Sequence, residues 1–142
     1  MERLKGKKLV EKLFMSGAVI NAFPLRLVFI QTRTTNRLGV SVGKKKFKSA
    51  VIRNKIKRQL RAACKDHLLV LLGELDSKYN LMVLYSGEKK PKPTELDKSF
   101  KLMVERFKKK VLENVKAKKK NRFILYRYFN VRFNNCLQDR LF

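Results

Sequence analysis

Apolar residues follow two different periods along the chain, and the changes between them mark the predicted elements. A helical period is present near the N-terminus, again after Ser49 and a third time after Thr94. An alternating period, typical of strands, is present in residues 25–30 and 38–42, and residues 80–85 form a continuous apolar run typical of a buried strand. The pattern predicts a helix, two or three antiparallel strands, a long helix, a strand and a final long helix.

The helix that follows Ser49 has two chemically different faces. Ser49 can cap its first turn, and Gly73 can end it. On a helical period, the apolar residues that share one face are Ile52, Ile56, Leu60, Ala63 and Leu71. The residues of the opposite face are Asn54, Lys57, Arg58, Arg61 and Lys65, with Arg53 at its edge. The pattern predicts a helix that packs on one side and presents cations on the other.

Four lysines immediately before this helix extend the cationic face: Lys44, Lys45, Lys46 and Lys48. An isolated run of charge is usually only a solvated surface. Here no acidic residue follows until Asp66, and the run leads into a helix whose first backbone N–H groups also favour anions. These two features favour contact with phosphate groups.

The overall charge points in the same direction. The 142 residues include 36 Lys and Arg against 11 Asp and Glu, so the formal net charge is +25. The 44% of apolar residues suits a globular domain rather than a disordered tail. A field of this strength attracts polyanions, and nucleic acid is the leading partner class, with an acidic protein or an anionic membrane as the alternatives.

Location and membrane contact can also be predicted from the sequence. No apolar run reaches the roughly 18 to 20 residues of a membrane span, and the basic N-terminus lacks the apolar core of a signal peptide. The two cysteines, Cys64 and Cys136, make neither a disulfide framework nor a zinc cluster. We therefore expect no membrane partner and a reduced, cytoplasmic location.

A search for catalytic groups finds little. His67 is the only histidine, so a nuclease that uses one histidine as acid and another as base is excluded. The acidic residues are scattered, whereas two-metal phosphoryl chemistry needs clustered carboxylates. Cys64 has basic neighbours but no evident base partner. The sequence predicts a binding protein with no catalytic residue and no metal site of its own.

The segment RLGVSVGKKKFKSAVIRNKIKRQLRAA, residues 37–63, resembles the signature of the bacterial ribonuclease P protein subunit. In that family a strand ending in Ser-Val-x-Lys-Lys precedes a helix carrying Arg-Asn-Arg-x-Lys-Arg. The matching positions are Ser41, Val42, Lys44, Lys45, Arg53, Asn54, Lys55, Lys57 and Arg58. Lys55 replaces the middle Arg, which keeps the charge but loses the bidentate fork. The resemblance covers roughly residues 3–113.

The resemblance implies an α+β fold: an α/β sandwich of the ribosomal protein S5 domain 2-like type, in the order α-β-β-β-α-β-α, with a mixed four-stranded sheet packed with helices. It also implies an endoribonuclease whose catalyst is a large RNA bearing Mg²⁺, with no cofactor on the protein alone. The protein would be a monomer, bound 1:1 to that RNA. The implied RNA-binding residues are Lys44, Lys45, Lys46, Lys48, Arg53, Asn54, Lys55, Lys57, Arg58, Arg61 and Lys65.

The same resemblance implies a cleft between sheet and helix that holds the single-stranded 5′ leader of precursor tRNA. The candidates for this cleft are Phe14, Phe23 and Arg26. By default the two phenylalanines are core residues, whereas an exposed ring beside the sheet would stack on unpaired bases. Both interpretations stay open at this point.

The C-terminal segment differs in composition from the rest. The final helix is expected to end near residue 115, so we divide the chain into an RNA-binding domain, residues 1–115, and a basic, aromatic extension, residues 116–142. No single period prevails in the extension. It is either a packed additional element or a flexible arm that becomes ordered on RNA, and the lysine run at its start favours the arm.

Three functions follow as hypotheses. The leading one is an RNA-binding subunit of ribonuclease P, which assists the catalytic RNA in removing the 5′ leader from precursor tRNA. A ribosomal or other structural RNA-binding protein of similar fold is the alternative. A self-sufficient nuclease is disfavoured because the required groups are missing.

Overall fold

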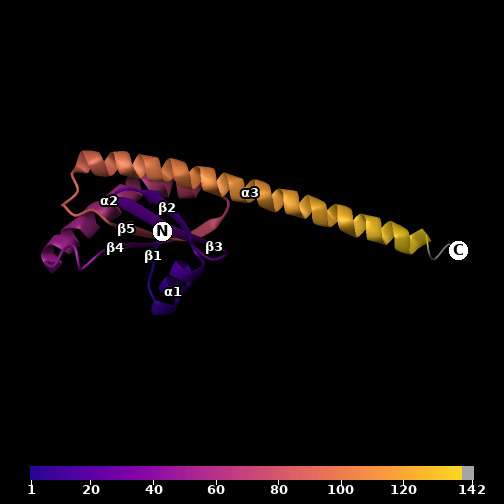
Figure 1. Cartoon of the computed structure of the whole chain (residues 1–142), viewed down its shortest axis with the longest axis horizontal. Coiled ribbons are helices and arrows are strands. Elements are labelled where there is room, and N and C mark those ends of the chain that lie inside the picture. The colour runs from indigo at the N-terminus through magenta and orange to yellow at the C-terminus, as the bar shows by residue number, and fades with distance from the viewer. Residues whose placement is uncertain (139–142) are drawn as a thin grey trace. The chain divides into compact units, whose positions relative to one another are not determined.

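The five strands within the described residues form one mixed sheet. The computed structural model describes residues 1–138, and side chains through residue 120. In chain order the elements are β1 (Glu2–Arg3), α1 (Lys7–Ser16), β2 (Ala18–Ala22), β3 (Leu25–Thr32), β4 (Arg37–Val42), α2 (Ala50–Glu74), β5 (Lys78–Tyr85) and α3 (Pro93–Gln138) (Figure 1). The strand order across the sheet is β1-β4-β5-β3-β2. β4 is parallel to β1 and β5, whereas β3 is antiparallel to β2 and β5.

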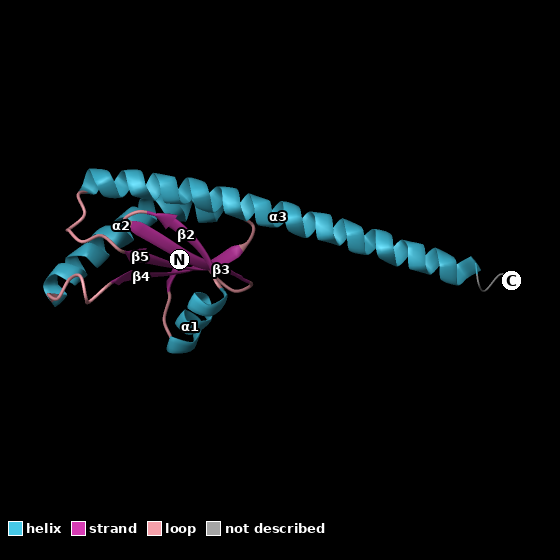
Figure 2. Cartoon of the chain, viewed as in Figure 1, coloured by secondary structure: helices cyan, strands magenta, loops and turns pink. Residues whose placement is uncertain are grey.

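The two faces of the sheet pack against different helices. Val28 of β3 belongs to a buried cluster with Leu13 of α1 and Met82 of β5. The next residue, Phe29, meets Phe107 of α3 with ring centroids 4.8 Å apart. Because successive side chains of a strand point to opposite faces, α1 covers one face and the first turns of α3 cover the other. Figure 2 shows α1 and α2 on opposite sides of the sheet.

α2 joins the first turns of α3 through a mixed polar and aromatic contact. His67 of α2 stacks on Phe100 of α3 with ring centroids 5.8 Å apart, and its Nε2 lies 2.7 Å from Oδ1 of Asp97. The apolar face predicted for α2 is buried or half-buried throughout, at Ile52, Ile56, Leu60, Ala63 and Leu71. Full burial of one leucine side chain stabilises the fold by about 1.5 to 3 kcal/mol, so this face is a major part of the core.

The sheet has one strand more than the predicted four. In β1, the backbone N–H of Glu2 donates to the carbonyl oxygen of Asn36 at 3.0 Å, and that of Leu4 donates to Leu38 at 2.9 Å. A strand of two residues is too short to show an alternating pattern, so no period in the sequence marks it. From α1 onward the order is the predicted α-β-β-β-α-β-α.

α3 is longer than predicted. It continues to Gln138, so the expected end near residue 115 is wrong. After Pro93 the chain contains neither glycine nor proline, and the lysines and alanine that follow residue 115 are good helix formers. Contacts divide the chain into one compact unit that ends at Phe107 and a second that begins at Lys108. The side chains of 121–142, which would distinguish a packed element from a flexible arm, lie outside the described residues.

Candidate nucleic-acid interface

The turn between β4 and α2, residues 43–49, is anchored from two sides. Phe47 is buried, and its ring packs against that of Tyr85 with centroids 6.0 Å apart. From α2, Nη1 of Arg53 donates hydrogen bonds to the carbonyl oxygens of Phe47 and Lys48, each at 2.7 Å. Arg53 is half-buried as a result. The lysines of this turn are therefore displayed on a fixed piece of backbone.

The cations of the turn and those on the outward side of α2 form one group, which we call the basic face. Its residues are Lys44, Lys45, Lys46, Lys48, Asn54, Lys57, Arg58, Arg61 and Lys65, all exposed except the half-buried Lys57. Lys46 also donates to the carbonyl oxygen of Ser86. Within the described part of the chain, none of these cations forms an ion pair with a carboxylate. The predicted cations of the turn and of α2 thus have no carboxylate partner within the described residues. Arg53 is half-buried, and Lys55 is exposed.

Two cations of the basic face also line a cavity at the edge of the sheet. This cavity has a volume of about 310 Å³, and its lining includes Arg61 and Lys65 of α2 together with Leu38, Val40 and Met82. Glu2 and Arg3 also line it, so the cavity combines three basic side chains and one acidic side chain with apolar ones. The basic face is therefore partly concave where it reaches β4.

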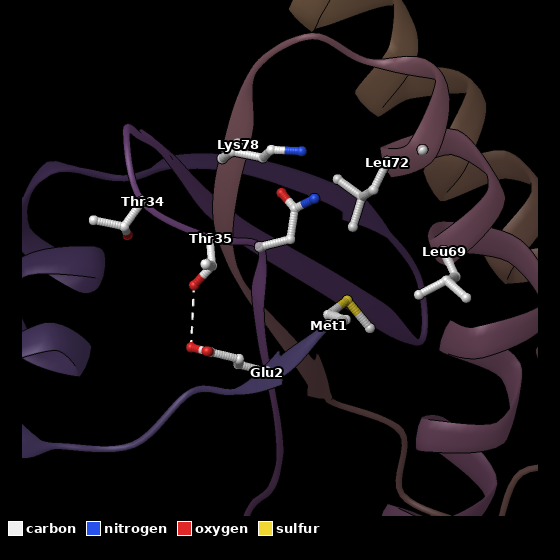
Figure 3. A pocket seen from close by; sticks show the side chains of 9 residues that line it. Met1, Glu2, Thr34, Thr35, Leu69, Leu72 and Lys78 are labelled. Carbon is white, nitrogen blue, oxygen red and sulfur yellow. Dashed lines mark hydrogen bonds between the residues drawn. The ribbon is translucent and has the colours of Figure 1, made fainter.

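A second cavity, of about 370 Å³, has a different character (Figure 3). Lys78 is the only cationic side chain among its lining residues, which also include Glu2. That carboxylate accepts hydrogen bonds from Nε of Arg37 at 3.1 Å and Oγ1 of Thr35 at 3.0 Å, which hold the pKa of Glu2 below its usual range. Glu2 is paired with Arg37, and a single cationic side chain lines the cavity, so we assign no polyanion to it.

Phe14 and Phe23 are surface residues, and the interpretation of either as a core residue is wrong. Phe14 on α1 is 48% exposed, and Phe23, in the turn between β2 and β3, is 80% exposed. Arg26 is exposed on β3, where its Nε donates to Oδ1 of Asn21 at 2.9 Å. It lies two residues from Val28, on the sheet face that α1 covers. Both rings are accessible to a stacking partner.

The groups considered for catalysis are placed as structural residues. His67 is held between Asp97 and Phe100. Cys64 is completely buried, and burial raises its pKa to about 12, so the thiol stays neutral. Among the described residues no three His, Cys, Asp or Glu side chains gather as a metal site. Within residues 1–138 no helix is both long enough and apolar enough to cross a membrane.

The sheet with helices on both faces and the uncompensated basic face define a small, strongly basic α+β protein. A family model, Ribonuclease P, matches residues 1–108. The chain belongs to the ribonuclease P protein family.

Solved structures share the fold. The ribonuclease P protein of Staphylococcus aureus superimposes with a TM-score of 0.63 and 22% identity, over 76% of this chain and 96% of that one. The corresponding protein of Thermotoga maritima gives a TM-score of 0.61 and 19% identity, over 75% of this chain and 97% of that one. At these identities the likeness concerns the fold alone.

A curated relative aligns over a shorter segment. The ribonuclease P protein component of Rickettsia peacockii (strain Rustic) is 41% identical over 56 residues, which are 39% of this chain and 45% of the relative. A Rickettsia rickettsii (strain Sheila Smith) protein of the same description matches to the same extent. The aligned segment thus spans less than half the length of these relatives.

Proposed function

We propose that this chain is the RNA-binding subunit of ribonuclease P and that it assists a catalytic RNA in removing the 5′ leader from precursor tRNA. The observation that carries the proposal is the basic face. It coincides with the signature segment of the family, and within the described residues no carboxylate neutralises it. Cations in this state bind phosphates by displacing condensed counterions.

In this proposal the protein binds and the RNA catalyses. The basic face docks on the catalytic RNA, which also binds the Mg²⁺, and the protein is a cytoplasmic monomer in a 1:1 complex. The fold would be of the ribosomal protein S5 domain 2-like type, with β1 as an addition at the sheet edge. The anchored turn supports this role because a fixed array of lysines loses little conformational freedom on binding.

The precursor leader would contact the side of the sheet that α1 covers. Phe14 and Phe23 supply exposed rings for unpaired bases, and Arg26 supplies a cation for the leader backbone. Stacking of this kind tolerates different bases. The arrangement would therefore favour any single-stranded leader over mature tRNA, which has none.

Reconstitution tests the proposal. The chain is mixed with a bacterial ribonuclease P RNA and precursor tRNA at limiting Mg²⁺, and leader release is measured. We expect the wild type to accelerate release and the variant K44A/K45A/R58A to lose the effect. The matched control K89A/K90A/K98A removes three exposed charges outside the basic face and should behave as wild type.

Two outcomes would overturn the proposal in favour of its alternatives. If the chain sediments with ribosomal particles in fixed stoichiometry and does not accelerate leader release, it is a ribosomal protein. Cleavage of precursor by the protein alone, after removal of all other RNA, would indicate a self-sufficient nuclease.

A further inference from the structure

A second group of cations lies on α3, at and beyond the last residue that matches the family. The family model ends at residue 108, whereas α3 continues as a helix to Gln138. In residues 108–120 the helix carries one acid, Glu113, and the lysines Lys108, Lys109, Lys110, Lys116, Lys118, Lys119 and Lys120. This part of the helix is therefore strongly basic in its own right.

Most of these lysines share one side of the helix. At about 100° per residue, five of them fall within an arc of about 120°, which we call the lysine stripe: Lys108, Lys109, Lys116, Lys119 and Lys120. All five are exposed, and no ion pair within the described residues involves them. Glu113 lies about 20° beyond the edge of the arc, next to Lys120. Lys110 and Lys118 lie on the opposite side and take part in interactions of their own.

We propose that the lysine stripe is a second RNA-contact site, which binds the phosphate backbone of the same RNA that the basic face contacts. This inference rests on the proposed function and adds a site of which only Lys108 lies within the family match. With a rise of 1.5 Å per residue, the stripe extends over about 18 Å of helix. It can therefore contact several phosphates at once.

The chemistry of the stripe favours RNA over a protein or a membrane. Lysine is depleted in protein–protein interfaces, whereas it is a point charge suited to phosphate. A membrane-surface helix needs a broad apolar face opposite its cations. Among the side chains of residues 108–120, the exposed large apolar ones are Leu112 and Val115, so no broad apolar face accompanies the stripe within that stretch. The stripe contains no arginine fork, so binding should be independent of sequence.

The test compares two sides of the same helix in the full chain. K116Q/K119Q removes two charges from the stripe, and K110Q/K118Q removes two from the opposite side. Affinity for a ribonuclease P RNA is measured over a salt series, with circular dichroism as the check on helicity. Each phosphate contact contributes about 0.7 to 0.9 to the salt slope. We therefore expect the stripe variant to lose about 1.5 in slope and roughly tenfold in affinity at moderate salt, and the control to change little.

Other outcomes separate this inference from the proposed function. K57Q/R58Q on the basic face is measured in parallel. If it loses affinity while K116Q/K119Q matches K110Q/K118Q, the stripe is not a contact and only this inference fails. If the wild type itself does not bind the RNA, the proposed function fails. Binding to vesicles of phosphatidylglycerol and phosphatidylcholine is measured as a third comparison. If K116Q/K119Q loses vesicle binding but keeps RNA binding, the stripe contacts a membrane surface and not RNA.

Discussion

Arg53→Ala and Arg58→Ala remove the same charge from α2, yet we expect them to affect folding very differently. Nη1 of Arg53 donates two hydrogen bonds to backbone carbonyls of the preceding turn, each at 2.7 Å. A hydrogen bond to a charged group contributes about 1.5 to 3 kcal/mol. One of the two is exposed, so we expect Arg53→Ala to lower the free energy of unfolding by about 2 to 4 kcal/mol in total. Arg58 is exposed and has no hydrogen-bond or ion-pair partner within the described residues, so its loss should change stability by less than about 0.5 kcal/mol.

The two variants should also differ in RNA binding. Arg58→Ala removes one phosphate contact and should lower the magnitude of the salt slope by about one. Arg53→Ala also releases the carbonyls of Phe47 and Lys48, so the lysines of the turn lose their fixed positions. We therefore expect a fall in slope larger than one contact explains. Arg53→Lys keeps the charge without the planar guanidinium. It should restore only the part of the salt slope that depends on the charge of residue 53.

Urea denaturation followed by circular dichroism gives the free energy of unfolding, and filter binding over a salt series gives the slope. Equal destabilisation by Arg53→Ala and Arg58→Ala would refute the anchoring role of Arg53. An unchanged slope in both variants would remove α2 from the RNA interface altogether.

Phe14→Ala should weaken binding of precursor tRNA by about 1 to 3 kcal/mol and leave the affinity for mature tRNA unchanged, because only the precursor has an unpaired leader. Equal losses of affinity for both RNAs, with an unchanged melting temperature of the protein, would contradict the leader assignment. Acid should destabilise the fold through Asp97, because Lys101 first and then His67 hold its pKa below the usual range. The stabilising contribution of Asp97 is fully present above its unfolded pKa and is lost as the pH falls through its folded pKa. Lowering the pH below about 4 should therefore reduce the melting temperature of Asp97→Asn less than that of the wild type. Deletion after residue 115 should leave the fold and precursor cleavage intact while lowering affinity for the catalytic RNA at moderate salt; a truncated chain that cannot fold would show that the extension completes the core.

The sequence predicted α2 well because its two faces differ in kind. Periodicity reports which side chains avoid water, and in α2 the apolar and cationic sets separate cleanly around the helix. The lysine run before α2 could be predicted as a phosphate-contacting surface because no acidic residue interrupts it. Phe47, the one aromatic residue inside that run, was the available sign that the turn is anchored.

Other features depend on neighbours that no local pattern contains. Whether Phe14 is core or surface is decided by how α1 lies on the sheet, so its ring was open to both interpretations. Whether Arg53 hydrogen-bonds to the turn depends on the positions of two backbone carbonyls, which are set only once the turn has formed. The end of α3 was misjudged because its amphipathic period fades before the helix does.

The distribution of charge makes α2 central both to the fold and to the proposed RNA interface. A net charge of +25 opposes compaction through self-repulsion, and the ion pairs within the described residues leave the basic face untouched. The repulsion among these cations is therefore offset by apolar burial, and much of that burial lies on the opposite side of α2, where Leu60 and Cys64 are completely inaccessible. A polyanion that neutralises the basic face relieves the repulsion, and any ligand that binds only the folded state also stabilises it by mass action. The free protein thus carries a charge repulsion that a polyanionic partner such as RNA would relieve.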